Sequence, residues 1–234
     1  MDSFPPGGAA VVVGTSGGIG RALAVRLNEL GCFETVVAFA RSGEFRLDLT
    51  DEASIAAAAD ALRQRGVQPR LVINAAGVLQ GQGCVAEKTW AQIDPKAMLQ
   101  AFAVNTVGPA LLVKHLLPLL PASGKSVFAV LSAKVGSIAD NRLGGWFSYR
   151  ASKAALNQIV RTAAVELGRK HKDAICVALH PGTVDTGLSA GFSKSGLVVQ
   201  PPATAAERLL RVIDTLEARH SGGFFDPHGA PIPW

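Results

Sequence analysis

The stretch AVVVGTSGGIGRALAVRLNELG, residues 10–31, contains the signals that decide the fold. Its first four residues are apolar and mostly β-branched, as in a short buried strand. A glycine cluster follows, and apolar residues then recur near helical spacing until Gly31, at a position where helices favour glycine. The stretch therefore predicts a strand, a glycine-rich turn and a helix in direct succession.

The same alternation recurs along the rest of the chain. Apolar runs bounded by turn residues predict strands, and longer stretches with helical periodicity predict helices. The further strands are expected at 35–40, 71–77, 126–132 and 174–182, and the further helices at 51–65, 94–120, 149–171 and 203–218. This order predicts an α/β fold of the Rossmann-like, doubly wound type, with a parallel sheet, helices on both faces and three layers α/β/α.

We expect one dinucleotide-binding domain that spans residues 1–234. Hydrophobic residues make up 48% of the chain and charged residues only 18%, which suffices to cover both faces of a buried sheet. The segment 186–202 is rich in Gly and Ser, ends in two prolines and follows a strand end, so we interpret it as a substrate lid. The terminal segment 224–234 is expected to seal a sheet edge or a subunit contact.

Composition and charge narrow the class of protein. The three cysteines, Cys32, Cys84 and Cys176, are widely spaced, which favours free thiols in a reducing compartment. The amino terminus lacks the basic and apolar regions of a signal peptide, so we expect a cytoplasmic protein with no membrane partner. The net charge of +5 is scattered, so we expect no nucleic-acid partner and interpret the charge as a basic cleft for an anionic cofactor. The histidines show no ligand spacing, and no metal is expected.

The glycines of the first turn suit a dinucleotide. Gly14, Gly18 and Gly20 form the pattern G-x-x-x-G-x-G between the first strand and the first helix. Glycine permits positive φ and close approach to a pyrophosphate, and the helix N-terminus offers unpaired N–H donors. The alternative is a tight turn without a ligand, but the flanking strand and helix favour the cofactor reading. Ser16 and Ile19 lie in the same turn and belong to the predicted site.

This glycine spacing resembles the short-chain dehydrogenase/reductase family, and the resemblance runs along most of the chain. The loop before the 149–171 helix is similar, more loosely, to the branch with the C-factor and sniffer-type carbonyl reductases. The motifs that carry these resemblances are INAAG at 73–77, VNTVGP at 104–109, GSIADNRLGGW at 136–146, YRASK at 149–153 and HPGTVDT at 180–186.

Tyr149 and Lys153 stand four residues apart at the start of a predicted helix, so both side chains share one face. A nearby cation would lower the pKa of the phenol and bring proton transfer toward neutral pH. The alternative is a packed Tyr with a solvated Lys. The family resemblance implies that Tyr149 donates a proton to a carbonyl oxygen and that Lys153 also binds the nicotinamide ribose. It further implies that Asn105 supports a water relay to Lys153, the alternative being an ordinary helical Asn facing solvent.

The hydroxyl that accompanies this pair in the family is where the sequence departs. The family often has paired serines here, and the second position is Ala133. Ser132 could supply the hydroxyl if the strand end is turned, and Ser137 could do so from the following loop. We choose Ser132 as the catalytic hydroxyl, which would stabilise the developing charge on the substrate oxygen.

Arg41 and Ser42 follow the second strand, where a carboxylate would select NAD and an Arg accommodates the phosphate of NADP. NADP is therefore predicted over NAD, the alternative being a solvated Arg41. The resemblance implies that Asp48 and Leu49 meet the adenine.

Two later motifs complete the predicted cofactor site. In HPGTVDT, Pro181 and Gly182 are expected to break the strand near the nicotinamide, and the resemblance gives the Val184 backbone and the Thr186 hydroxyl to the carboxamide. The alternative is a plain turn, but the place at the carboxyl end of a strand favours a ligand role. The remaining predicted cofactor residues follow the third strand and are Asn74, Ala75, Ala76 and Gly77, together with the shared Asn105, Tyr149 and Lys153.

The predicted function is an NADP(H)-dependent oxidoreductase that transfers a hydride between the nicotinamide and a small ketone, aldehyde or quinone and its alcohol. The alternative is a dinucleotide-binding regulatory or signalling module with weak or no catalysis, which Ala133 permits. By analogy with the family, a homo-oligomer, dimer or tetramer, is expected.

Overall fold

The computed structural model describes residues 1–43, 45–188 and 198–234. Its centre is a six-stranded sheet in which every pair of neighbouring strands is parallel, in the order β2-β1-β3-β4-β5-β8. The strands are β1 (Ala9–Val13), β2 (Thr35–Phe39), β3 (Pro69–Asn74), β4 (Ser126–Leu131), β5 (Ala174–Leu179) and β8 (Phe224–Phe225). All residues of β1, β4 and β5 are buried, which explains their continuous apolar runs. The predicted parallel α/β sheet is confirmed.

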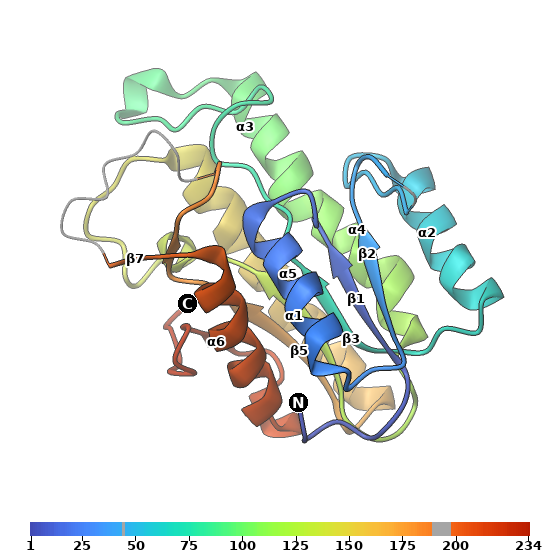
Figure 1. Cartoon of the computed structure of the whole chain (residues 1–234). Helices are drawn as coiled ribbons and strands as arrows, with labels where there is room; N and C mark the ends of the chain where they lie inside the picture. Colours follow the sequence, from blue (N-terminus) through green and yellow to red (C-terminus); the bar gives the residue numbers. More distant parts are fainter. Residues whose placement is uncertain (44, 189–197) are drawn as a thin grey trace.

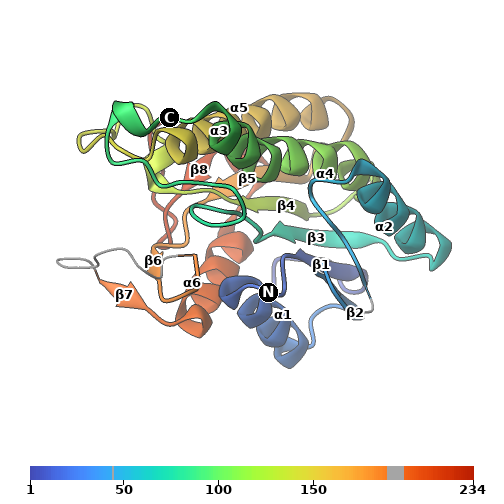
Figure 2. The ribbon, with the colours of Figure 1, turned by 90° about the horizontal axis from the view of Figure 1, so that it is seen from above.

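Helices cover both faces of this sheet (Figures 1 and 2). Helices α1 (Gly18–Leu30) and α6 (Pro202–Thr215) pack on one face. Helices α2 (Glu52–Gln64), α4 (Gly108–Leu116) and α5 (Phe147–Lys170) bury apolar side chains against the other face, and α3 (Pro95–Phe102) packs beside α5. Figure 2 shows the three layers edge-on. The expected α/β/α layering is confirmed.

The caps explain where several helices begin and end. Asp51 precedes α2 and its carboxylate accepts a hydrogen bond from the Ala53 N–H; Asp94 does the same for Ala97 before α3. Gly31 ends α1 in the left-handed region at φ 60°.

The helix expected at 94–120 is not one regular helix. It consists of α3, a π turn at Ala103–Val107, α4 and a final 3-10 turn at Leu117–Leu119. Pro109 lacks the N–H that an α-helical bond to residue 105 needs, so the backbone widens just before it. The stretch Pro95–Leu119 is long enough to span a membrane, and an 18-residue window within it has a mean hydropathy of 1.3, which is apolar enough to do so. Its residues Leu112 and Leu116 are fully buried in the core beside the sheet.

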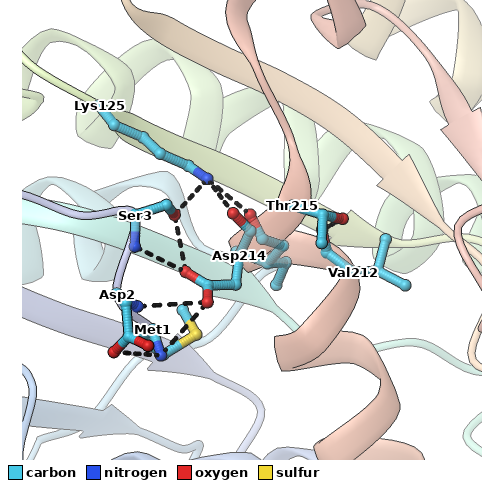
Figure 3. Close-up of polar contacts among 8 residues, drawn as sticks. Met1, Asp2, Ser3, Lys125, Val212, Asp214 and Thr215 are labelled. Carbon is cyan, nitrogen blue, oxygen red and sulfur yellow. Dashed lines mark hydrogen bonds and ion pairs between the residues drawn. The ribbon is translucent and has the colours of Figure 1, made fainter.

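Polar contacts hold the N-terminal segment near the amino-terminal ends of the strands (Figure 3). Lys125, just before β4, donates hydrogen bonds to Ser3 Oγ at 2.7 Å and to the main-chain oxygens of Ile213 and Asp214 at 3.0 and 2.7 Å. The Asp214 carboxylate accepts from Ser3 Oγ at 2.7 Å. Burial alone would raise the pKa of Asp214, but the bonds from Ser3 and the amino group lower it. This cluster lies at the amino-terminal ends of the strands, whereas the predicted site lies at their carboxyl ends.

The segment 224–234 does cover a sheet edge. Strand β8 pairs with β5, and the Trp234 ring stacks on Phe224 with centroids 5.7 Å apart.

Candidate active site

The glycine turn after β1 leaves no room for side chains. Gly14 has φ +93°, and a Cβ there would lie 2.7 Å from the Ala76 nitrogen. A Cβ at Gly20 would lie 2.3 Å from the Gly14 oxygen, and one at Gly18 would lie 3.0 Å from Thr186 Cγ2. The turn thus opens directly onto the N-terminus of α1 and places the predicted residues of β3 and of the 180–186 motif around it. A backbone cradle of this kind, at the N-terminus of a helix, fits a pyrophosphate.

Asn74 adds an unpaired donor beside this turn. It ends β3 directly next to Val13 of β1, and its Oδ1 accepts from the Ala76 N–H at 3.1 Å. Among the described residues, the buried Asn74 Nδ2 meets no hydrogen-bond acceptor. Because a buried N–H without a partner is costly, this atom is the kind of orphan that a polar ligand would satisfy.

Asn105 is buried rather than facing solvent. From the π turn, its Oδ1 accepts from the Val78 N–H at 2.9 Å, and its Nδ2 donates to the Val78 oxygen at 2.8 Å and to Ser152 Oγ at 3.1 Å. A Cβ added to Gly77 would lie 3.3 Å from Asn105 Oδ1 and 3.4 Å from Lys153 Nζ. The structure therefore brings Gly77 of the INAAG motif, Asn105 of the π turn and Lys153 of α5 close together.

Tyr149 and Lys153 share the buried face of α5. Lys153 Nζ lies 5.8 Å from the centre of the Tyr149 ring and donates to the Leu131 oxygen at 2.9 Å. Burial raises the pKa of Tyr149 and lowers the pKa of Lys153 to about 8. The expected lowering of the phenol pKa is thus wrong, because desolvation disfavours both charged forms. At neutral pH, Tyr149 holds its proton and can donate it.

The pKa of Lys153 predicts a pH-dependent stability. The ordinary pKa is 10.5 and the folded value about 8, so between them the unfolded chain binds more protons. The free energy of unfolding should therefore rise with pH through this window, by about 2 kcal/mol between about pH 7.5 and about pH 10. Urea unfolding of the wild type and of Lys153→Met at both pH values measures it.

The difference between the two proteins isolates Lys153. Cys176 and Tyr149, whose pKa values burial raises, are present in both and cancel. A difference in unfolding free energy that stays constant across this range would contradict the buried, depressed Lys153.

The hydroxyls expected near the substrate have partners within the protein. Ser132 directly follows β4, is buried, and donates its hydroxyl proton to Asn157 Oδ1 at 2.7 Å. Ser137 is also buried, and its Oγ accepts from the Asp140 N–H at 3.1 Å. The half-buried Ala133 lies just after the strand end. A catalytic role for Ser132 stays a prediction. In the structure its hydroxyl proton is directed at Asn157 of α5.

Arg41 lies in the segment that follows β2 and is exposed, as is its neighbour Ser42. Its Nη1 donates to Gln82 Oε1 at 2.9 Å, across the end of β1. Sequence reasoning missed Gln82. The one signal in the sequence was its place between two glycines, Gly81 and Gly83, and in the structure all three residues have positive φ.

The predicted adenine residues are already engaged by the protein. Asp48 accepts from the N–H and the hydroxyl of Thr50 at 2.9 and 2.7 Å, and these bonds lower its pKa. Leu49 is buried, and its Cβ and its carbonyl group lie close to Gly108 of α4.

The 180–186 motif is held by a two-stranded pair, β6 (Thr183–Val184) with β7 (Val199–Gln200). Gln200, which sequence reasoning missed, donates to the Pro181 oxygen at 2.7 Å. Gly182 has φ +80°, and a Cβ there would lie 2.8 Å from Gln200 Nε2. This pair fixes both ends of the expected lid at 186–202, of which residues 189–197 lie outside the described residues.

A third missed residue is Glu87, which is fully buried and binds the first turn of α5. Within the described ranges, no group of three or more His, Cys, Asp or Glu side chains is placed to hold a metal ion.

Comparisons with known proteins agree with this geometry. A family model described as enoyl-(acyl carrier protein) reductase matches residues 13–214. C-signal of Myxococcus xanthus is 35% identical over 164 residues, which cover 70% of this chain and 92% of that protein. The 1-hydroxy-2-glutathionyl-2-methyl-3-butene dehydrogenase of Rhodococcus sp. (strain AD45) is 31% identical and covers 96% of this chain and 98% of its own.

Solved structures share the whole fold. The NADPH-bound carbonyl reductase from chicken fatty liver matches with a TM-score of 0.85 and 28% identity, over 99% of this chain and 96% of that one. Carbonyl reductase Sniffer of D. melanogaster also gives a TM-score of 0.85, at 22% identity, over 97% of this chain and 99% of its own, which is a likeness of fold.

Proposed function

The chain belongs to the short-chain dehydrogenase/reductase family, and on that basis we propose that it is an NADP(H)-dependent oxidoreductase that reduces a small carbonyl compound to its alcohol. The observation that carries the proposal is the buried Tyr149–Lys153 pair beside a glycine cradle that side chains cannot enter. The NADPH-bound carbonyl reductase from chicken fatty liver, 28% identical, supports the cofactor and the reaction class.

The residues of the site divide the work of reduction. Reduced nicotinamide, when bound, supplies the hydride that the carbonyl carbon receives. Tyr149 donates its hydroxyl proton to the substrate oxygen, which completes the alcohol. Lys153, protonated below its pKa of about 8, provides the positive charge that stabilises the resulting tyrosinate and a donor for the nicotinamide ribose.

Asn105 and Thr106 hold the backbone that carries Lys153. Asn105 Nδ2 donates to Ser152 Oγ, and Thr106 Oγ1 donates to the Ser152 oxygen at 2.8 Å. Because Ser152 directly precedes Lys153, these contacts with the π turn help to fix the position of the Lys153 ammonium group. The water relay that would return a proton through Asn105 is part of this proposal.

Arg41 is proposed to bind the 2′-phosphate of NADPH. Its loss should raise the KM for NADPH by about 10–100-fold, since a hydrogen bond between charged partners contributes about 1.5–3 kcal/mol. The KM for NADH should change by less than about threefold. Steady-state kinetics of Arg41→Ala with both cofactors measure the effect, with Arg26→Ala, at a partly exposed arginine of α1, as the control. An equal loss for both cofactors would contradict the assignment.

Finer features complete the proposal. The substrate is a small ketone, aldehyde or quinone, bound beneath a lid at 186–202. The protein works in the cytoplasm as a homo-oligomer, in line with family analogy, without nucleic-acid, membrane or metal partners.

One observation favours a second candidate, a regulatory module that binds the dinucleotide without efficient catalysis. Ala133 lacks a hydroxyl, and the Ser132 proton is directed at Asn157. Oxidation of NADPH over a panel of aldehydes, diketones and quinones separates the candidates. Turnover that prefers NADPH supports the reductase, whereas tight NADPH binding without turnover supports the module.

A further inference from the structure

We propose that Glu87 is a positioning residue for Tyr149. Its buried carboxylate binds the N-terminus of α5 and so fixes the first helical turn, which carries Tyr149. The inference rests on the proposed reductase function only for its kinetic consequence. Its structural part concerns how the protein itself holds Tyr149.

Glu87 binds the start of α5 at two places. Its main-chain oxygen accepts from the Trp146 N–H at 2.5 Å. Its carboxylate oxygens lie 3.2 and 3.3 Å from the Ser148 nitrogen, and the Ser148 hydroxyl donates a further bond to Oε1. Glu87 is 0% exposed and Ser148 1% exposed. The residues on either side of Phe147, the first residue of α5, are thus both tied to one residue of the loop after β3.

This helix start lacks an ordinary cap. The N-terminal N–H groups of a helix have no partner within it, and a Ser, Thr, Asp or Asn at the preceding position normally accepts from one of them. That position is Trp146, whose side chain makes no capping hydrogen bond. The Glu87 carboxylate supplies the acceptor from 61 residues earlier, and its negative charge is favourable at the positive end of the helix.

The backbone that enters α5 needs such an anchor. Gly144, Gly145 and Trp146 all have positive φ, at 63°, 66° and 51°. A bulky residue in this region is strained and persists only where its surroundings hold it. The bond from Trp146 N–H to Glu87 is one such contact, and the Trp146 ring then packs edge-on against Tyr149, with centroids 6.2 Å apart.

The burial of this charge suggests a role besides stability. Among the ion pairs of the described residues, none involves Glu87. A buried carboxylate held only by N–H and hydroxyl groups contributes little net stability, because desolvation offsets its bonds. Its evident consequence is a fixed position for Ser148, the neighbour of Tyr149. A misplacement of about 1 Å at a catalytic group costs on the order of 100-fold in rate.

The experiment uses the fact that Tyr149 is the single tyrosine of the chain. Carbon-13 labelled tyrosine therefore gives one NMR signal that reports this residue without any substrate. In Glu87→Gln we expect that signal to shift or broaden, and kcat for carbonyl reduction to fall by about 10–100-fold. The dissociation constant for NADPH should stay within about twofold, because the cofactor turn is untouched. Glu166→Gln, the same change on the exposed face of α5, should leave all three measurements unchanged.

Ser148→Ala keeps the proposal testable if Glu87→Gln does not fold. It removes one donor to Glu87 and should move the same NMR signal and lower kcat in the same direction, by a smaller factor. A folded Glu87→Gln with a wild-type tyrosine signal and wild-type kcat would overturn the inference, as would such a Ser148→Ala if the first variant does not fold. A wild type that binds NADPH but reduces nothing would instead refute the proposed function, and the NMR comparison would still decide the position of Tyr149.

Discussion

Replacement of Tyr149 by phenylalanine should lower kcat for carbonyl reduction by about 10²–10⁴-fold. The change removes only the hydroxyl, and in the proposed mechanism the buried Tyr149, whose ring centre lies 5.8 Å from Lys153 Nζ, is the proton donor. The ring, its packing on Trp146 and the glycine turn stay in place. Turnover measured with NADPH and the best carbonyl of the panel provides the test.

The control for this variant is the binding of NADPH. Its dissociation constant should stay within a few-fold of wild type, and thermal unfolding should show an intact fold. If Tyr149→Phe keeps more than about a tenth of the wild-type kcat, another group donates the proton and the assignment of Tyr149 is wrong.

Substitution of Gly20 by valine should weaken NADPH binding by at least about 100-fold, equivalent to about 2.7 kcal/mol. Even a Cβ at this position would lie 2.3 Å from the Gly14 oxygen and 2.8 Å from the Gly14 carbonyl carbon, so the backbone of the turn must move. Isothermal titration of NADPH into the purified variant measures the loss.

Gly168→Ala is the matched control. Gly168 lies within α5, where a Cβ meets nothing within 4 Å, so the change should leave NADPH binding intact and stabilise the helix by about 0.5–1 kcal/mol. Wild-type affinity in a folded Gly20→Val would show that this turn does not bind the cofactor.

Most of the fold follows from local signals in the sequence. The apolar runs of β1, β4 and β5 are buried on both faces, which is why their continuous hydrophobicity predicted a parallel sheet. The caps Asp51, Asp94 and Gly31 mark helix boundaries with local chemistry. The π turn at Ala103–Val107 was not predicted, because helical periodicity does not distinguish one widened turn from a regular one.

The site was predictable where its residues lie in motifs at strand ends. Gly77 lies just after the carboxyl end of β3, where ligands of such sheets bind, and Asn105 of the π turn and Lys153 of α5 lie close to it. Gln82, Gln200 and Glu87 were missed, because each contacts a residue that is distant from it in sequence. The direction of the Tyr149 pKa was also wrong from sequence, since burial is a property of the packed structure.

Deuterium transfer tests the central claim most directly. The purified protein is incubated with NADPH that carries deuterium at the transferable nicotinamide position and with each carbonyl of the panel, and the products are analysed by mass spectrometry. The account predicts an alcohol with deuterium on the former carbonyl carbon, formed faster from NADPH than from NADH and lost in Tyr149→Phe. Tight binding of NADPH without deuterium in any product would contradict it and identify a dinucleotide-binding module.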